Sequence, residues 1–170
     1  IDADRLVADR DKQIGFKVLQ NGSMVERTDS LHRILKRREL TEDDWLVLRY
    51  TAKDAGLDFY CTACYEDEFD FLLDDMSVDA VKVASADIDN IPLLKYLALA
   101  DTEVHIDTGS ANIWEVDRAV ELLGEPVIHH VPSGYPAHLP SIHLRVIQTL
   151  RMMYPELTIG FSDHSPGWEM

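Results

Sequence analysis

A lysine stands in an otherwise apolar run of the sequence, between Val81 and Val83. Burying the ammonium group of Lys82 is costly unless an anion meets it. Neighbouring runs of the same kind end in hydroxyl residues, which suit phosphate or carboxylate oxygens. We therefore interpret Lys82 as a ligand for an anionic substrate. The alternative is a structural salt bridge to Asp87 or Asp107.

The residues Ser162, Asp163 and His164 follow another such run. A neutral imidazole coordinates a divalent metal well when a carboxylate or carbonyl holds its second nitrogen. His164 is therefore a candidate metal ligand, although an isolated histidine is more often a hydrogen-bonded structural residue. His129 and His130 are consecutive, so in a strand at most one of them points toward such a site. We treat both as structural or supporting residues.

These side chains require a scaffold that brings several strand ends together. From about residue 57 onward, short β-branched or aromatic runs alternate with helical patterns, which indicates a parallel sheet with crossover helices. In such folds the active site lies at the carboxyl ends of the strands. The expected strands are residues 57–62, 80–85, 103–108, 126–131 and 157–162.

Capping residues mark the helices that should connect these strands. An N-cap side chain accepts a hydrogen bond from the first turn, and proline is tolerated in that turn. We expect helices after Thr41, Asn90 and Asn112, with Glu115 completing a capping pair, and a further helix that opens at Pro140 and Ser141 and stops near Pro155. Residues 1–40 read as a long loop with one short helix at 30–37.

The composition is that of an acidic globular protein. The chain has 170 residues, of which 46% are hydrophobic, and a formal charge of −15, which disfavours nucleic acid and anionic membranes as partners. The apolar runs are far shorter than the roughly 18 to 20 residues of a membrane span, and no signal sequence opens the chain. We therefore expect a cytoplasmic protein. Cys61 and Cys64 form a single C-T-A-C, for which core or pocket-lining thiols are favoured over a redox or zinc site.

Five β/α units are too few to close an eight-stranded barrel, so the sequence indicates either an open α/β sheet or part of a barrel. The loop-like first 40 residues and the end of the chain directly after a strand favour the second interpretation. We expect an α/β fold, an incomplete (β/α)8 TIM-type barrel that covers roughly strands 3 to 7.

Five motifs resemble, in order and spacing, the sialic acid synthase (N-acetylneuraminate synthase) family. They are K-V-A-S-A-D (82–87), N-I-P-L-L (90–94), D-T-G (107–109), S-G-Y-P (133–136) and G-F-S-D-H-S (160–165). The similarity extends upstream through residues 38–44 and 56–62 and covers nearly the whole chain. The resemblance implies that residues 1–170 are an interior part of a single (β/α) barrel synthase domain. The first strands and a C-terminal antifreeze-like domain would lie outside the chain.

The resemblance also implies an activity, that of a nonulosonic (sialic) acid synthase. Members of the family condense phosphoenolpyruvate with an N-acylated hexosamine such as N-acetylmannosamine and release phosphate, with Mn²⁺ or Mg²⁺ as Lewis acid. A homodimer is implied as well. By the same resemblance, phosphoenolpyruvate contacts Thr62, Lys82, Ser85, Ser133 and Ser162, the sugar contacts Asp87 and Tyr135, the metal binds His164, and the catalytic residues are Lys82, Asp87 and His164.

Five positions depart from the family pattern, among them Ala63 and Cys64, which replace a proline and an aromatic residue. Asp107 stands where the family has the serine of S-T-G, which places a negative charge at an expected phosphoenolpyruvate contact. Ser133 stands where asparagine is common, and Ala86 where glycine is usual. These changes indicate a divergent branch and leave two alternatives open. One is a non-catalytic sugar-binding homologue, and the other is a phosphoenolpyruvate-dependent synthase that acts on a different sugar.

Overall fold

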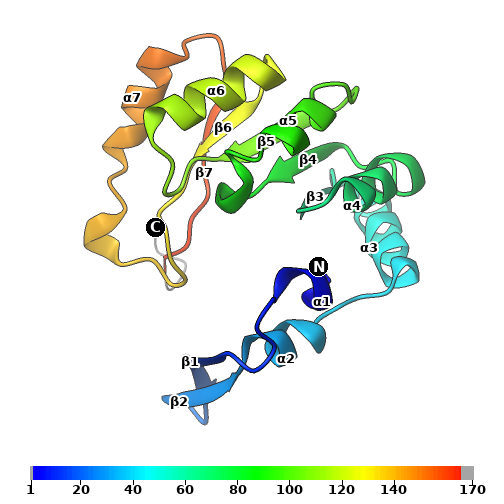
Figure 1. Cartoon of the computed structure of the whole chain (residues 1–170), viewed down its shortest axis with the longest axis vertical. Coiled ribbons are helices and arrows are strands. Elements are labelled where there is room, and N and C mark those ends of the chain that lie inside the picture. Colours follow the sequence, from blue (N-terminus) through cyan, green and yellow to red (C-terminus); the bar gives the residue numbers. More distant parts are fainter. Residues whose placement is uncertain (1, 166–170) are drawn as a thin grey trace. The chain divides into compact units, whose positions relative to one another are not determined.

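The computed structural model describes residues 2–165, except for the side chains of Lys17 and Leu19. The chain divides into two compact units, Ile1–Tyr50 and Thr51–Met170, which are described separately (Figure 1). Helix α3 (Glu42–Asp54) contains the boundary between them. No helix in the described residues is long and apolar enough to cross a membrane.

The first unit holds a β-hairpin between two short helices. These elements are α1 (Ala3–Leu6), the antiparallel strands β1 (Gln13–Gln20) and β2 (Ser23–Ser30), and α2 (Leu31–Lys36). The expected short helix is confirmed, but the expectation of a long loop before it is wrong. Asn21 and Gly22 form the hairpin turn with φ angles of 51° and 77°, a conformation that an Asn-Gly pair favours. The alternation of Ile14, Phe16 and Val18 supports the preceding strand.

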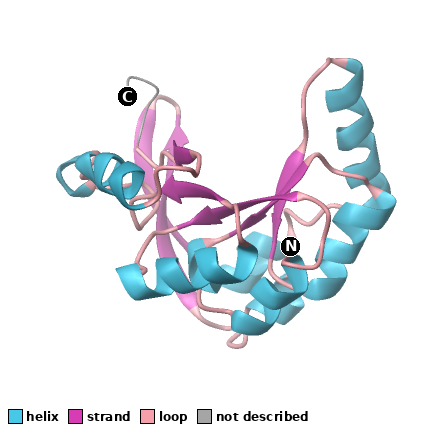
Figure 2. Ribbon diagram, turned by 90° about the horizontal axis from the view of Figure 1, so that it is seen from above, coloured by secondary structure: helices cyan, strands magenta, loops and turns pink. Residues whose placement is uncertain are grey.

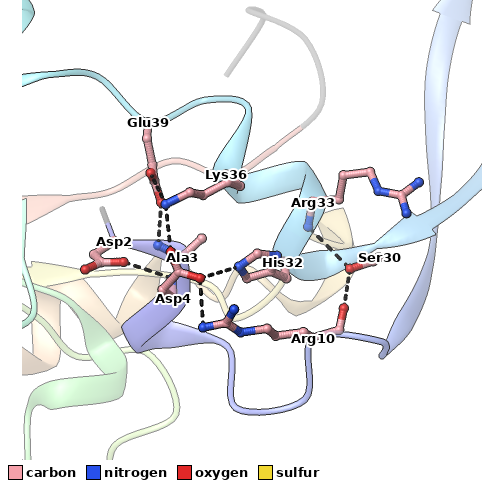
Figure 3. Close-up of polar contacts among 9 residues, drawn as sticks. All are labelled: Asp2, Ala3, Asp4, Arg10, Ser30, His32, Arg33, Lys36 and Glu39. Carbon is pink, nitrogen blue, oxygen red and sulfur yellow. Dashed lines mark hydrogen bonds and ion pairs between the residues drawn. The ribbon is translucent and has the colours of Figure 1, made fainter.

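Asp4 links α1 to α2 through an exposed charge network (Figure 3). Its carboxylate lies 2.9 Å from Arg10, 2.9 Å from His32 and 2.8 Å from the Lys36 ammonium. The hydrogen bond from Lys36, followed by that from His32, lowers the pKa of Asp4 from 3.8 to about 2. Lys36 also pairs with Glu39 at 2.8 Å, so several charges share this network.

The second unit is built, in its described part, on five parallel strands in sequence order. They are β3 (Tyr60–Ala63), β4 (Ala80–Val83), β5 (Glu103–Asp107), β6 (Val127–His130) and β7 (Ile159–Phe161), and each overlaps an expected strand. A doubly wound sheet reverses its strand order at a switch point, whereas consecutive strands of a barrel stay in order. The order β3-β4-β5-β6-β7 is therefore that of a barrel segment, and Figure 2 shows the sheet with helices alongside it.

Helices follow the strands largely where the capping residues indicate. They are α4 (Glu66–Asp70), continued by a wider turn at Phe71–Asp75, α5 (Ile91–Leu97), α6 (Ile113–Leu123) and α7 (Arg145–Met153). Asn90 caps α5, Asn112 and Glu115 form the expected capping box of α6, and Thr41 caps α3 by accepting a hydrogen bond from the Asp44 N–H.

The helix expected to open at Pro140 begins instead at Arg145. Leu139–Ser141 forms a separate short 3₁₀ turn. His143 then takes a positive φ of 52°, which a right-handed helix does not accommodate, so the two segments cannot join.

The two faces of the sheet differ in polarity. On one face Val81, Val83, Ile106 and Ile128 are fully buried, and helices α5 and α6 cover the sheet (Figure 1). The strand register places a second set of side chains on the opposite face, here called the polar face, because successive residues of a strand alternate. The polar face includes Tyr60, Thr62, Lys82, His105, Asp107, His129, Gly160 and Ser162. In a closed barrel this face lines the interior.

Candidate active site

Lys82 of β4, Asp107 of β5 and Ser162, which directly follows β7, meet on the polar face. The Lys82 ammonium lies 2.9 Å from Asp107 Oδ2 and donates a hydrogen bond to Ser162 Oγ at 3.1 Å. The Ser162 hydroxyl donates in turn to Asp107 Oδ1 at 2.8 Å. The Lys82 and Asp107 side chains are 17% and 8% exposed. The three residues therefore form a closed, mostly buried ring of hydrogen bonds, here called the Lys82 ring.

The ring gives the charge of Lys82 a partner within the chain. The structural salt bridge that the sequence allowed is present, and its partner is Asp107. The same ring joins Lys82 to Ser162, two of the residues predicted to hold an anion. An ion pair at this position does not exclude a ligand, because an incoming anion can compete for the ammonium. The ligand role of Lys82 therefore stays a prediction.

Ser85 lies directly after β4, where the backbone of the next strand end passes close to it. A Cβ placed on Gly109 would lie 2.9 Å from Ser85 Oγ and 2.8 Å from Val131 Cγ1, closer than real Cβ atoms approach. Glycine at this position lets the segment after β5 pass beside the Ser85 hydroxyl. The D-T-G motif thus has a steric reason for its glycine, and Ser85 lies in the same group of strand ends as the Lys82 ring.

The two remaining hydroxyl candidates lie on β3 and after β6, which neighbour strands that contribute to the ring. Thr62 is the register partner of Lys82 on β3. Ser133, which follows β6, shares a hydrogen bond of 2.7 Å with the hydroxyl of Ser110. The structure therefore places all the predicted anion ligands at the carboxyl ends of the strands. Of these, it joins Lys82 directly to Ser162, while Ser133 is bonded to a hydroxyl that the sequence did not indicate.

His164 has one ring nitrogen held by a backbone carbonyl, an arrangement that both a metal ligand and a structural histidine adopt. Its Nδ1 donates to the Pro132 carbonyl at 3.1 Å, and its ring lies against that of Tyr135 with centroids 3.8 Å apart and the planes tilted by 31°. A proton on Nδ1 leaves the lone pair on Nε2, which is the atom that would coordinate a metal. Residues 2–165 bring no three His, Cys, Asp or Glu side chains together as a metal site. The chain thus fits one imidazole ligand of a divalent ion, and the other donors are not found in this part of it.

The two predicted sugar contacts are placed differently. Asp87 lies in a 3₁₀ turn after β4 and accepts a hydrogen bond from Asn90 Nδ2 at 3.3 Å. Tyr135 lies in the loop after β6 and is 83% exposed. Its phenol is therefore available to a ligand, whereas part of Asp87 is already held by the start of α5.

The two cysteines lie in β3 and directly after it. Both are free and half-buried. Burial, followed by the nearby charges of Asp87 and Glu68, raises the pKa of Cys64 to about 11, and burial also raises the pKa of Cys61. A raised pKa disfavours the thiolate at neutral pH and so disfavours redox or nucleophilic chemistry at either cysteine.

A stack of aromatic rings adjoins the Lys82 ring on the polar face, and the sequence indicated no role for two of its members. The ring of His105 lies 4.9 Å from that of Tyr60 and 5.1 Å from that of His129. His105 Nδ1 contacts His129 Nε2 at 2.8 Å, and its Nε2 contacts Glu103 at 2.8 Å. The period-two alternation that puts Lys82 on the polar face also puts Tyr60 and His105 there. Their place on this face can therefore be inferred from the sequence once the strand register is known.

His129 and His130 point to opposite faces, as their adjacent positions predict. His130 is buried against the helical side and contacts the Ile142 carbonyl, while His129 joins the stack on the polar face. Burial, followed by the charge of His105, lowers the pKa of His129, so its imidazole is neutral at neutral pH. Its buried Nδ1 has no hydrogen-bond partner in the described part of the chain.

A hollow of about 490 Å³ lies away from these residues, where Tyr96, Leu99 and Asp101 are among its lining residues. These residues end α5 or precede β5, so the hollow is at the amino ends of the strands. Catalytic sites of parallel barrels lie at the carboxyl ends, and the strand-end cluster is therefore the better candidate site.

Comparison with known proteins decides the family. The whole chain, residues 1–170, matches the sequence model of the NeuB family. The chain belongs to the NeuB family. This NeuB chain is 32% identical over 145 residues to the N,N'-diacetyllegionaminic acid synthase of Legionella pneumophila, covering 80% of the chain and 40% of that protein. It is 31% identical over 134 residues to the N-acetylneuraminate-9-phosphate synthase of Drosophila melanogaster, covering 76% and 36%.

Solved structures agree with the barrel assignment. The NeuB chain superposes with a TM-score of 0.76 on the N-acetylneuraminic acid (sialic acid) synthetase of Leptospira borgpetersenii, determined in complex with citrate, at 30% identity over 81% of the chain and 49% of that structure. The spore coat polysaccharide biosynthesis protein SpsE of Bacillus subtilis gives 0.71 at 34% identity over 75% and 37%. The expected family and fold are confirmed. The NeuB chain spans about half or less of the length of these proteins.

Proposed function

We propose that the protein carrying this chain is a nonulosonic acid synthase. It joins C3 of phosphoenolpyruvate to the open-chain aldehyde of an N-acylated hexosamine such as N-acetylmannosamine; water adds at C2, and the C–O bond to phosphate breaks. The observation that carries the proposal is the meeting of Lys82 and Ser162 at the strand ends of a NeuB barrel. The named activities of the Legionella and Drosophila relatives, both sugar-acid synthases, support it.

In this proposal the predicted residues take complementary roles. The ammonium of Lys82 and the hydroxyls of Thr62, Ser85, Ser133 and Ser162 hold the phosphate and carboxylate of phosphoenolpyruvate, because charge-assisted hydrogen bonds suit such oxygens. Asp87 and Tyr135 orient the sugar through its hydroxyl groups. His164 provides Nε2 to Mn²⁺ or Mg²⁺. The metal, when bound, supplies Lewis-acid polarisation of the sugar aldehyde.

The Lys82–Asp107 ion pair favours a second candidate function. A lysine already neutralised by a buried carboxylate is a weaker anion ligand, which suits a non-catalytic homologue that binds a sugar or sugar acid. A synthase for a different sugar is also compatible with the altered strand ends. Turnover distinguishes these candidates, since only the binder lacks it.

The test uses the full-length protein with phosphoenolpyruvate, Mn²⁺ and a panel of N-acylated hexosamines. We expect phosphate and a 2-keto acid to appear in equal amounts, and only when both a sugar and the metal are present. Lys82→Ala should abolish phosphoenolpyruvate binding, whereas Lys95→Ala, on the exposed side of α5, should retain activity and serves as the control. Sugar binding without phosphate release from any sugar would refute the synthase and support the binder.

We further propose that the protein acts as a cytoplasmic homodimer without nucleic acid or membrane partners. The charge of −15 supports the second part, because it repels polyanions. Light scattering coupled to size-exclusion chromatography measures the oligomer, and a monomeric mass at micromolar concentration would contradict the dimer.

A further inference from the structure

The Lys82 ring uses the hydrogen-bonding capacity that an anion would need. Lys82 has three N–H donors, of which one faces Asp107 Oδ2 and one faces Ser162 Oγ. The single hydroxyl proton of Ser162 is directed to Asp107 Oδ1. A ligand oxygen therefore finds the Ser162 proton already donated and the lysine charge already matched. Asp107 engages both of these predicted anion ligands at once.

Of the groups around Asp107, Lys82 carries the permanent positive charge. Lys82 faces it from β4 and Ser162 from β7, while His105 shares its own strand and His129 is its register partner on β6. His129 is neutral at neutral pH because burial and His105 lower its pKa. His105 contacts His129 at 2.8 Å and pairs with the Glu103 carboxylate at 2.8 Å, which offsets positive charge on its ring. An anion bound at Lys82 would therefore lie beside Asp107 with one ammonium between two negative groups.

We infer that Asp107 is an internal competitor for the anion and sets the anion affinity of this site. Its carboxylate occupies the place beside Lys82 Nζ that a ligand phosphate or carboxylate takes, and the ligand must displace it to reach both Lys82 and the Ser162 hydroxyl. Asp107 is thus a specificity-determining residue, because it penalises ligands in proportion to their negative charge. The identity of the anion rests on the proposed function, whereas the competition does not.

The test measures dissociation constants of phosphoenolpyruvate and of inorganic phosphate for the full-length protein by titration calorimetry. Asp107→Asn removes the charge with little change of shape, and we expect both ligands to bind at least about tenfold tighter, since one like charge a few ångströms away is removed. The matched control is Asp89→Asn, which makes the same change of net charge in the exposed loop before α5. It should alter affinity by less than about twofold, because solvent screens that charge.

Two further variants keep the inference open to refutation. In Lys82→Met/Asp107→Asn the gain in affinity should disappear, because the ammonium that Asp107 competes for is absent. If Asp107→Asn does not give a cooperative thermal melt, Asp107→Ser carries the same expectation, since its shorter side chain leaves room for water beside Lys82.

Unchanged affinity in a folded Asp107 variant would overturn the competition, and so would an equal gain in Asp89→Asn. These results are independent of turnover. If Asp107→Asn binds anions more tightly but releases no phosphate, the competition by Asp107 stands and the proposed synthase activity is refuted.

Discussion

Gly160 of β7 tests the packing of the polar face most directly. A Cβ at this position would lie 2.8 Å from both Nδ1 and Cε1 of His129 and 3.4 Å from its Cγ. The His129 ring cannot move freely, because it is stacked on His105 and bonded to it at 2.8 Å. Gly160→Ala therefore forces either the ring or β7 to shift.

The expected cost follows from two opposing effects. Overpacking a filled site costs about 1–3 kcal/mol, whereas replacing glycine in an unstrained backbone stabilises by about 0.4–1 kcal/mol through the unfolded state. We expect Gly160→Ala to lower the free energy of unfolding by about 1–2 kcal/mol. In the His129→Ala background, the same substitution should be neutral or stabilising, because the imidazole that it meets is gone.

Urea denaturation of the full-length protein measures these changes. Gly15→Ala is the matched control, since a Cβ on Gly15 has no neighbour within 4 Å and the glycine lies in a strand as well. It should not be destabilising beyond about 0.5 kcal/mol. A Gly160→Ala protein as stable as the parent, or one whose cost persists without the His129 ring, would refute this packing of His129 against β7.

Three further outcomes are expected. Lys82→Ala should lower the free energy of unfolding by about 3 kcal/mol, because it leaves buried Asp107 without its cation. A protein of ordinary stability remains folded after such a loss. Urea titration measures it. Cys64, whose pKa is raised to about 11, should react with a disulfide reagent at pH 8 far more slowly in the folded protein than in urea. Asp4, whose pKa is lowered to about 2, should contribute to the free energy of unfolding. This contribution should be fully present above about pH 4 and be lost as the pH falls toward 2. Asp4→Asn should flatten this acid dependence in thermal melts.

Each of these outcomes has a contrary result. Equal losses in Lys82→Ala and in Lys95→Ala, which changes an exposed lysine, would show that the buried ion pair does not contribute. Equal thiol reaction rates in the folded and unfolded protein would contradict the burial of Cys64. An acid dependence between pH 4 and 2 that Asp4→Asn leaves unchanged would assign it to other carboxylates.

The sequence predicted the β/α framework well, because local chemistry encodes it. Asn90, Asn112 and Thr41 accept hydrogen bonds from the first turns of their helices wherever they occur, so their helices were found with nearly correct starts. The five strands were found for a similar reason, since apolar runs between helical patterns need no distant information. Where local signals compete, the prediction was wrong: Pro140 suggested a helix start that the positive φ of His143 interrupts.

The hairpin of the first unit shows a different limit. Its Asn21-Gly22 turn and alternating β1 residues are local signals, but they lie in a polar stretch that also reads as a loop. The pairing of β1 with β2 supplies the backbone hydrogen bonds that a single polar strand lacks. Strand pairing, rather than the composition of either segment, therefore determines that these residues form a hairpin and not a loop.

The types and positions of the candidate residues came from the sequence alone: a lysine within a strand, hydroxyls at strand ends and a histidine after the last strand. Only the tertiary structure decided which of them meet. Lys82, Asp107 and Ser162 are separated by tens of residues, and parallel pairing in order brings them within 3.1 Å of one another. The partner of a buried charge depends on strand register, which no local pattern specifies. The register is also what makes Asp107, rather than a ligand, the group that neutralises Lys82 in this structure.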